Sequence, residues 1–173
     1  ENTITFEVDD VRNTAPVADG YDGGAHISLA DTETVVLSGV TTTPADFTIE
    51  TWFRADGTQD DGDILFAAVG GTHDLGVKFN ASGGLDGFVR TTDAAGPAIN
   101  VLDGEWHHVV GAFDGTNTDI YVDGSLDKTT NDGVALSYVA GKSLFIGRYR
   151  SAPDAPFDGT IDEVAIWNRS LSA

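Results

Sequence analysis

The dipeptide Asp-Gly recurs along this chain at short intervals, and it constrains the fold more than any other feature. Glycine adopts a positive φ without steric cost and aspartate tolerates one, so the pair favours tight turns between antiparallel strands. Turns at such spacing indicate many short strands. The pair occurs at Asp19-Gly20, Asp22-Gly23, Asp56-Gly57, Asp61-Gly62, Asp86-Gly87, Asp103-Gly104, Asp114-Gly115, Asp123-Gly124, Asp132-Gly133 and Asp158-Gly159.

Between these turns lie short runs rich in β-branched and aromatic residues, which we predict to be strands. Several alternate with a period of two, as strands with one buried face do; in one of them Phe47, Ile49 and Phe53 share a face, and Trp52 lies on the polar face. No segment keeps a helical period. The pattern predicts an all-β fold, a two-sheet antiparallel jelly-roll β-sandwich. The predicted strands are Phe47–Ala55, Ile64–Val69, Leu75–Asn80, Phe88–Thr92, Trp106–Asp114, Asp119–Asp123, Ser143–Arg148 and Thr160–Asn168.

The charge of the chain excludes whole classes of partner. Nine Lys and Arg residues stand against 28 Asp and Glu residues, which gives a net charge of -19. A field of this sign repels nucleic-acid phosphates and anionic lipid, so we expect neither nucleic-acid binding nor membrane insertion. The carboxylates suit hard cations such as calcium, although most of them serve simply as a solvated surface.

Length and composition favour one main domain. At 173 residues the chain can bury a sizeable core without disulfide bonds or a structural metal ion, and it has no cysteine. We predict a β-sandwich over residues 20–173. Residues 1–19 form a linker-like segment with a leading strand at Glu1–Val8, and this segment either belongs to the sandwich or ends a preceding domain. The chain has no initiator methionine or signal peptide, so we expect a monomeric module of a longer, exported protein, outside the cell.

Four motifs follow one another along residues 20–172. They read YDGGAHI, FTIETWF, GEWHHV followed by IYVDG, and GTIDEVAIWNRSLS. In order and approximate spacing they resemble the laminin G-like family of concanavalin A-like jelly rolls. The resemblance implies a secreted recognition module that binds rather than catalyses.

The resemblance also implies a structural calcium ion that ties the first strand to the last. Carried over to this sequence, Asp22 and the carbonyls of Gly23 and Gly24 supply one half of the ligands, and Asp162 supplies the other half. Carboxylate and carbonyl oxygens are the ligands that calcium prefers. The alternative is that Asp22 is a turn residue and Asp162 a solvated strand residue.

A second candidate site lies on the rim of the sandwich. Related sandwiches place a calcium-ligating residue where His73 and Asp74 precede a predicted strand. The opposing loop departs from the pentraxin pattern, and it begins with Arg148 and Arg150, two of the nine basic residues. The alternative is that these arginines only offset the negative charge of the surface. The expected ligand-binding residues are His73, Asp74, Arg148, Tyr149, Arg150 and Asp154, with Asp74 as the metal ligand.

Tryptophan and histidine residues lie in the predicted strands rather than in loops. We expect Trp52, Trp106 and Trp167 to pack in the core or on a sheet, because a tryptophan that stacks on a sugar more often stands on a loop. His107 and His108 are neighbours in a strand, so they point to opposite faces and cannot share a metal ion.

Catalysis is unexpected, although the same sandwich carries laminarinase-like glycoside hydrolases. Such enzymes hold two carboxyl groups about 5–9.5 Å apart, which acids at alternate strand positions provide. No segment reads Glu-x-Asp-x-Glu, and Asp162 and Glu163 are adjacent. Neither a cysteine nor a Gly-x-Ser-x-Gly nucleophile is present.

We therefore expect a calcium-dependent carbohydrate-binding adhesion module of a bacterial surface protein, an adhesin, that binds a host or algal glycan. The alternatives are a protein-binding module of laminin G type and an accessory domain of a polysaccharide-degrading enzyme.

Overall fold

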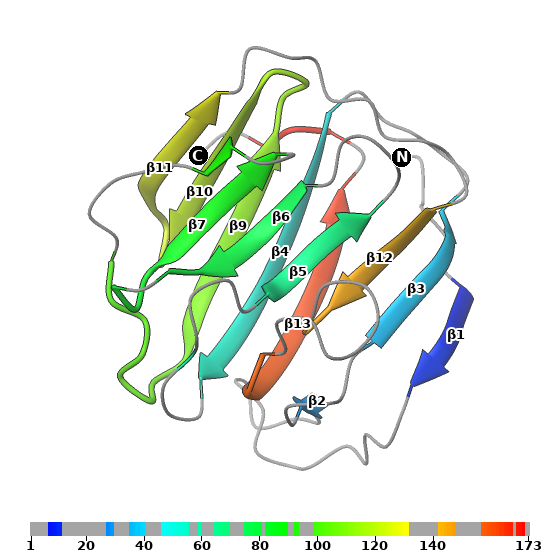
Figure 1. Cartoon of the computed structure of the whole chain (residues 1–173), viewed down its shortest axis with the longest axis horizontal. Coiled ribbons are helices and arrows are strands. Elements are labelled where there is room, and N and C mark those ends of the chain that lie inside the picture. The colour runs from blue at the N-terminus through cyan, green and yellow to red at the C-terminus, as the bar shows by residue number, and fades with distance from the viewer. Residues whose placement is uncertain are drawn as a thin grey trace.

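The computed structural model describes residues 7–11, 27–29, 35–40, 46–55, 59, 64–69, 75–80, 82–89, 92–93, 99–131, 142–147, 157–167 and 169–171. The regular elements of these residues are all strands, and they form two antiparallel sheets. Figure 1 shows the sheets as two layers, with the seven-stranded sheet in front of the six-stranded one. The predicted β-sandwich is confirmed.

The seven-stranded sheet joins strands from both ends of the chain. Its spatial order is β1 (Glu7–Val11), β3 (Val35–Val40), β12 (Lys142–Ile146), β5 (Ile64–Val69), β6 (Leu75–Phe79), β7 (Leu85–Val89) and β8 (Thr92–Asp93).

The six-stranded sheet holds the strands that carry Trp52 and Trp167 and the strand that follows Trp106. Its spatial order is β11 (Ser125–Asn131), β10 (Asn117–Val122), β9 (His107–Phe113), β4 (Phe47–Ala55), β13 (Gly159–Trp167) and β2 (Ile27–Leu29). Strand β4 therefore lies in the middle, with β9 on one side and β13 on the other.

Phenylalanine rings fill the space between the sheets. Phe79 and Phe157 are stacked with their centroids 5.6 Å apart, and Phe53 meets them edge-on at 5.9 and 6.2 Å. All three are fully buried. Offset and edge-on ring pairs add to the hydrophobic free energy gained from the buried area. The rest of the core is aliphatic, apart from one further phenylalanine; it comprises Ile49, Ala55, Val77, Leu85, Val101, Val109, Phe113, Ile120, Val122, Ile146 and Ile161.

A buried ion pair joins the two sheets. Lys128 on β11 donates from Nζ to the carboxylate of Asp86 on β7 and, at 2.9 Å, to the carbonyl of Leu85. The side chains of Lys128 and Asp86 are only 4% and 13% exposed. Asn80 Nδ2 also donates to Asp86 at 3.0 Å. A buried ammonium is tolerated only with such partners.

The Asp-Gly pairs do not all form turns. Asp123 and Gly124 close the β10–β11 hairpin with φ values of 50° and 78°, the signature of the expected tight turn. Asp86 and Gly87, in contrast, lie inside β7. The turn before β7 is instead formed at Asn80, whose Oδ1 accepts the N–H groups of Ser82 and Gly84.

The predicted strand Phe88–Thr92 is wrong at both ends. Strand β7 begins at Leu85, so that Asp86 lies inside the sheet with Lys128 as its partner, and Thr92 belongs to β8, which pairs antiparallel with β7. The short strands β2 and β3, and β11, were not predicted. Strand β1 pairs with β3 at the edge of the seven-stranded sheet. The proposed division of the chain at residue 19 stays a prediction.

Candidate functional site

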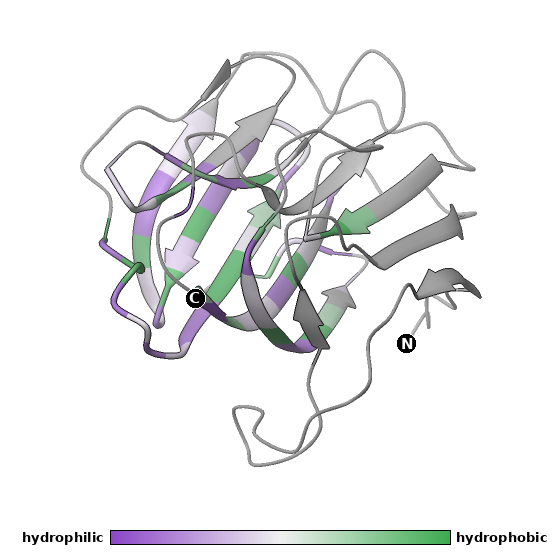
Figure 2. Ribbon diagram, turned by 60° about the horizontal axis from the view of Figure 1, so that its bottom comes forward, coloured by the Kyte–Doolittle hydropathy of each residue, from purple (hydrophilic) through white to green (hydrophobic). Residues whose placement is uncertain are grey.

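The outer face of the six-stranded sheet carries all three tryptophans. Strand β4 alternates: Ile49 and Phe53 point inward and are at most 1% exposed, whereas Trp52 points outward and is partly exposed. Figure 2 shows this alternation as bands of opposite hydropathy along the strands. We call the surface formed by Glu50, Trp52, Arg54, Trp106, His108 and Trp167 the tryptophan face.

Strand pairing brings these residues together from three parts of the chain. Trp52 on β4 lies opposite His108 on β9 and Asp162 on β13. Trp167, at the end of β13, lies opposite Thr48. Trp106 immediately precedes β9, which places it beside Arg54. Residues that lie directly opposite each other on neighbouring strands point to the same face of the sheet. The three indoles therefore lie on one surface.

Specific contacts hold the rings of the tryptophan face. The rings of Trp52 and His108 have centroids 5.0 Å apart, and the Arg54 guanidinium lies 5.4 Å above the Trp106 ring. Trp167 Nε1 donates to Glu50 Oε1 at 3.1 Å. Glu50 Oε2 lies 3.5 Å from His108 Nε2. One carboxylate thus links two of the aromatic side chains.

The segment after β13 bounds the tryptophan face at one end. Thr48 Oγ1 donates to the carbonyl of Arg169 at 3.0 Å and accepts the N–H of Leu171 at 2.9 Å. These bonds hold the segment over Thr48, which is fully buried. Trp167, beside it, keeps 41% of its surface exposed.

The sequence predicts that the tryptophans pack in the core or on a sheet. They pack on the sheet, and none belongs to the buried core. The expectation that a sugar-stacking tryptophan stands on a loop made this surface easy to miss. The signal was nevertheless present, because Trp52 alternates with Glu50 and Arg54 on the polar face of its strand.

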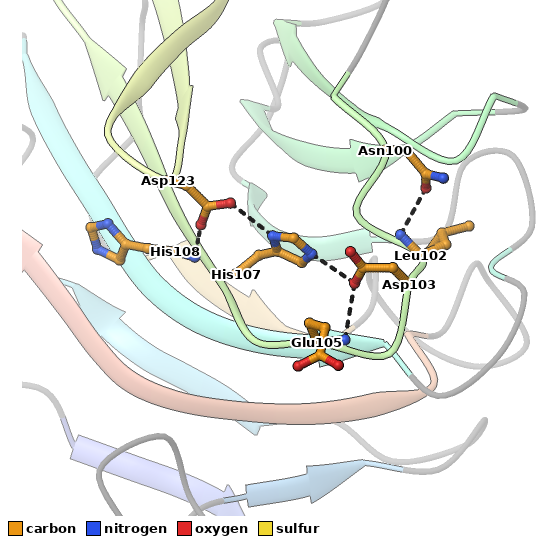
Figure 3. A network of polar contacts seen from close by, with 7 residues as sticks. All are labelled: Asn100, Leu102, Asp103, Glu105, His107, His108 and Asp123. Carbon is orange, nitrogen blue, oxygen red and sulfur yellow. Dashed lines mark hydrogen bonds and ion pairs between the residues drawn. The ribbon is translucent and has the colours of Figure 1, made fainter.

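A polar network lies at the start of β9, on the inner side of the sheet (Figure 3). His107 Nδ1 lies 2.8 Å from Asp123 Oδ2, and His107 Nε2 lies 3.0 Å from Asp103 Oδ1. Asp123 also accepts the N–H of His108 at 2.9 Å. His107 and His108 point in opposite directions, as expected for strand neighbours.

The charges of this network favour an imidazolium ion. Burial lowers the pKa of His107, but the hydrogen bonds and charges of Asp123 and Asp103 outweigh burial, so its pKa lies above the ordinary 6.5. The N–H of Glu105 and the bond to His107 lower the pKa of Asp103. With both ring nitrogens donating to carboxylates, His107 has no lone pair left to act as a general base. The network clamps the β10–β11 turn to the loop before β9.

Most residues of the predicted calcium and rim sites lie outside the described residues. This holds for Asp22, Gly23, Gly24, His73, Asp74, Arg148, Tyr149, Arg150 and Asp154.

Of the residues predicted to hold the structural calcium ion, only Asp162 is described, and it lies where the pairing of β13 with β2 ends. Ile161 is opposite Ile27, the first residue of β2. The pairing with β4 shifts just after Asp162, at a bulge where Glu163 has a φ of 52°. Asp162 therefore lies one residue beyond the last residue of β13 that pairs with β2.

The strands that flank the predicted rim site run in the same direction, because β6 and β12 are both antiparallel to β5. Leu75 opens β6 at the level of Ala68, and Ile146 closes β12 at the level of Phe66. The start of β6 and the end of β12 are thus two residues apart along β5. The rim site itself stays a prediction.

Two features are absent from the described residues. These residues contain no group of three or more histidine, aspartate or glutamate side chains placed to hold a metal ion. They also include no helix long and apolar enough to span a membrane.

The family model described as the Concanavalin A-like lectin/glucanases superfamily, of laminin G type, matches residues 22–173. No curated protein matches the sequence. Among solved structures, domain 4 of the extracellular GH43 arabinanase AbnA from Geobacillus stearothermophilus, in complex with arabinotriose, is 17% identical with a TM-score of 0.72. That match covers 97% of this chain and 83% of the other.

Two further structures share the fold. Domains LG4-5 of the mouse laminin alpha1 chain are 18% identical with a TM-score of 0.67, over 92% of this chain and 46% of the other. The CBM40 of the Ruminococcus gnavus IT-sialidase, bound to alpha2,3 sialyllactose, is 13% identical with a TM-score of 0.61, over 85% of this chain and 91% of the other.

Proposed function

This chain belongs to the concanavalin A-like lectin/glucanases superfamily, and we propose that it is a non-catalytic module that binds carbohydrate. The tryptophan face carries the proposal. An indole stacks on the apolar face of a sugar ring, while neighbouring carboxylates accept hydrogen bonds from sugar hydroxyls. The arabinanase domain bound to arabinotriose and the CBM40 bound to sialyllactose support a sugar as the ligand.

A binding assay with single substitutions tests this function. We expect at least one polysaccharide of a panel to retard the protein in affinity electrophoresis. Trp167→Ala should weaken that binding about tenfold or more, because tryptophan is a typical hot-spot residue and Trp167 is the most exposed of the three indoles. Leu126→Ala is the matched control, since it removes exposed apolar surface (55% exposed) from the edge strand β11. Equal binding by both variants would remove the tryptophan face from the site.

A structural calcium ion is a second part of the proposal. Asp162, Asp22 and the carbonyls of Gly23 and Gly24 would hold the ion, which would tie the segment before β2 to β13. The pairing of Ile27 with Ile161 supports it, because it places the first residue of β2 next to the position of Asp162. When bound, the ion supplies charge and coordination that link two distant parts of the chain.

Thermal unfolding with calcium and with a chelator tests the clamp. A site held at 100 times its dissociation constant adds about 2.7 kcal/mol, or about 5 °C or more in a domain of this size. Asp162→Asn should remove the response, and Glu163→Gln, its exposed neighbour, should retain it. An identical melting temperature in calcium and in chelator would exclude the clamp.

Protein binding of laminin G type is the second candidate function. The exposed side chain of Leu126 on the edge strand β11 favours it, since such a surface suits a partner chain. A pull-down in which a protein partner binds and no glycan competes would favour this function.

We further propose that the module acts outside the cell, within a longer bacterial surface protein or beside the catalytic domain of a polysaccharide-degrading enzyme. The similar fold of a domain from an extracellular arabinanase supports this setting. Binding of the isolated module to intact bacterial, algal or host cells, competed by soluble polysaccharide, would test the adhesive role.

A further inference from the structure

The tryptophans are spread along the sheet instead of being gathered at one point. Trp167 lies at the level of Thr48, Trp52 is four residues further along β4, and Trp106 lies by Arg54, two residues beyond. At about 3.3 Å per residue, the rows of Thr48 and Arg54 are about 20 Å apart. Trp167 and Trp52 come from the adjacent strands β13 and β4, and Trp106 precedes β9 on the other side of β4, so the three indoles form a diagonal row across the sheet.

A row of this length exceeds a single sugar ring. Each ring of a glycan chain presents an apolar face to one indole, and successive indoles accept successive parts of the chain. Contacts made by one chain at several places are intramolecular after the first, which raises the affinity without a new kind of contact. A terminal monosaccharide meets one indole only and gains nothing from the other two.

The charges on the same three strands disfavour an anionic ligand. Strands β4, β9 and β13 together contain three acids, Glu50, Asp162 and Glu163, and one basic residue other than histidine, Arg54. The guanidinium of Arg54 stacks on Trp106. The whole chain carries a net charge of -19. A uronate, sulfate or sialate on the ligand meets a negative field here, whereas a hydroxyl finds carboxylate acceptors.

The rings are also held in place before any ligand arrives. Glu50 accepts from Trp167 Nε1 and faces His108 Nε2, and the His108 ring packs on Trp52. Rings fixed in this way lose little side-chain entropy when a ligand stacks on them.

We infer that the ligand of the tryptophan face is an extended, uncharged glycan chain that lies along the diagonal from Trp167 to Trp106. This inference rests on the proposed carbohydrate binding and adds the ligand's charge and length.

Two measurements test the inference. The first takes the neutral polysaccharide that binds best from a panel of arabinan, xylan, galactan, laminarin and mixed-linkage glucan, and compares it with its carboxymethyl derivative and with alginate and heparin. We expect the anionic polymers to bind at least about tenfold more weakly at low salt, with a smaller difference in 0.5 M NaCl, where screening shortens the reach of the charges to about 4 Å. Glu163→Gln should narrow the difference, because it removes an exposed acid from β13.

The second measurement compares oligosaccharides of increasing length from the same polymer. Affinity should rise with oligosaccharide length until the glycan spans the three indoles. In Trp106→Ala and in Trp167→Ala, the affinity should reach its plateau at a shorter oligosaccharide. Leu126→Ala should leave the length dependence unchanged.

The outcomes separate this inference from the proposed function. Anionic polymers that bind as tightly as neutral ones, or a monosaccharide that binds as tightly as the polymer, overturn the inference and leave carbohydrate binding standing. Failure of every polymer, neutral and anionic, overturns both.

Discussion

The two faces of the six-stranded sheet use different aromatic residues. The inner face buries phenylalanine, with Phe53 packed against Phe79 and Phe157 and no polar atom to satisfy. The outer face carries tryptophan, and the indole N–H of Trp167 finds Glu50. Phenylalanine contributes only apolar area, whereas tryptophan adds a polar atom that needs a partner or water. The choice of aromatic residue therefore distinguishes a surface made for packing from one that meets solvent and ligand.

The largest expected effect comes from the inner side of β13, where a single methyl group does not fit. A Cβ on Gly159 would lie 2.3 Å from the carbonyl oxygen of Arg54 and 2.6 Å from Cζ of Phe157. Gly159→Ala should therefore cost about 4 kcal/mol or more of unfolding free energy, measured by urea denaturation. Gly124→Ala is the control, because it also places a side chain at a positive φ, which should cost about 1 kcal/mol, but nothing lies within 4 Å of its added Cβ. If the two variants were equally stable, the close packing of this side would be disproved.

Removing a ring from each face compares them directly. Phe53→Ala should cost about 3–5 kcal/mol, because it leaves a cavity among fully buried rings. Trp167→Ala should cost less than about 1 kcal/mol, because much of that ring is already exposed, and should act on ligand binding instead. A Trp167→Ala variant as unstable as Phe53→Ala would make this tryptophan a core residue.

The His107 network predicts a dependence of stability on pH. Because the pKa of His107 is raised in the folded state, its stabilisation is complete below the unfolded pKa of about 6.5 and is lost as the pH rises through the folded value. His107→Gln should cost about 2 kcal/mol at pH 6 and less at pH 9.

Urea denaturation of the protein and of His107→Gln at several pH values measures this loss. His108→Gln serves as the control, since the His108 side chain lies on the outer face and only its backbone N–H, which the substitution keeps, bonds to the network. A constant difference between the protein and His107→Gln from pH 6 to pH 9 would contradict a charged imidazole.

The smallest expected effect concerns the indole N–H alone. Trp167→Phe keeps a ring but removes the hydrogen bond to Glu50, which should cost about 0.5 kcal/mol of stability at this exposed position. Its ligand affinity should fall between those of the protein and Trp167→Ala, as isothermal titration can measure. Affinity equal to that of Trp167→Ala would show that ring orientation, held by Glu50, matters more than ring area.

Local patterns predicted much of the fold. The alternation in Phe47–Ala55 correctly separated Phe53 from Trp52, and Asp123-Gly124 correctly marked a hairpin. Asp86-Gly87 was wrongly predicted to be a turn. Its aspartate binds Lys128, 42 residues further along the chain, and a local sequence pattern does not indicate so distant a partner.

The site was harder to predict than the fold. The common surface of the three tryptophans forms only when β9, β4 and β13 pair. It therefore depends on the order of strands in the sheet, which turn patterns in the sequence do not predict. The clamp of His107 by Asp103 and Asp123 likewise depends on the approach of a hairpin turn to a loop.

Lys128 and Asp86 have a consequence for how the two sheets can move. An interface of aliphatic and phenylalanine side chains tolerates small sliding, since one apolar contact replaces another at little cost. The ammonium of Lys128 has no such substitute: a shift of one sheet past the other would leave a buried charge without its carboxylate and its carbonyl, at a cost of about 3–5 kcal/mol. One side chain thus selects a single alignment of the layers, and the diagonal of tryptophans on the outer face keeps its geometry.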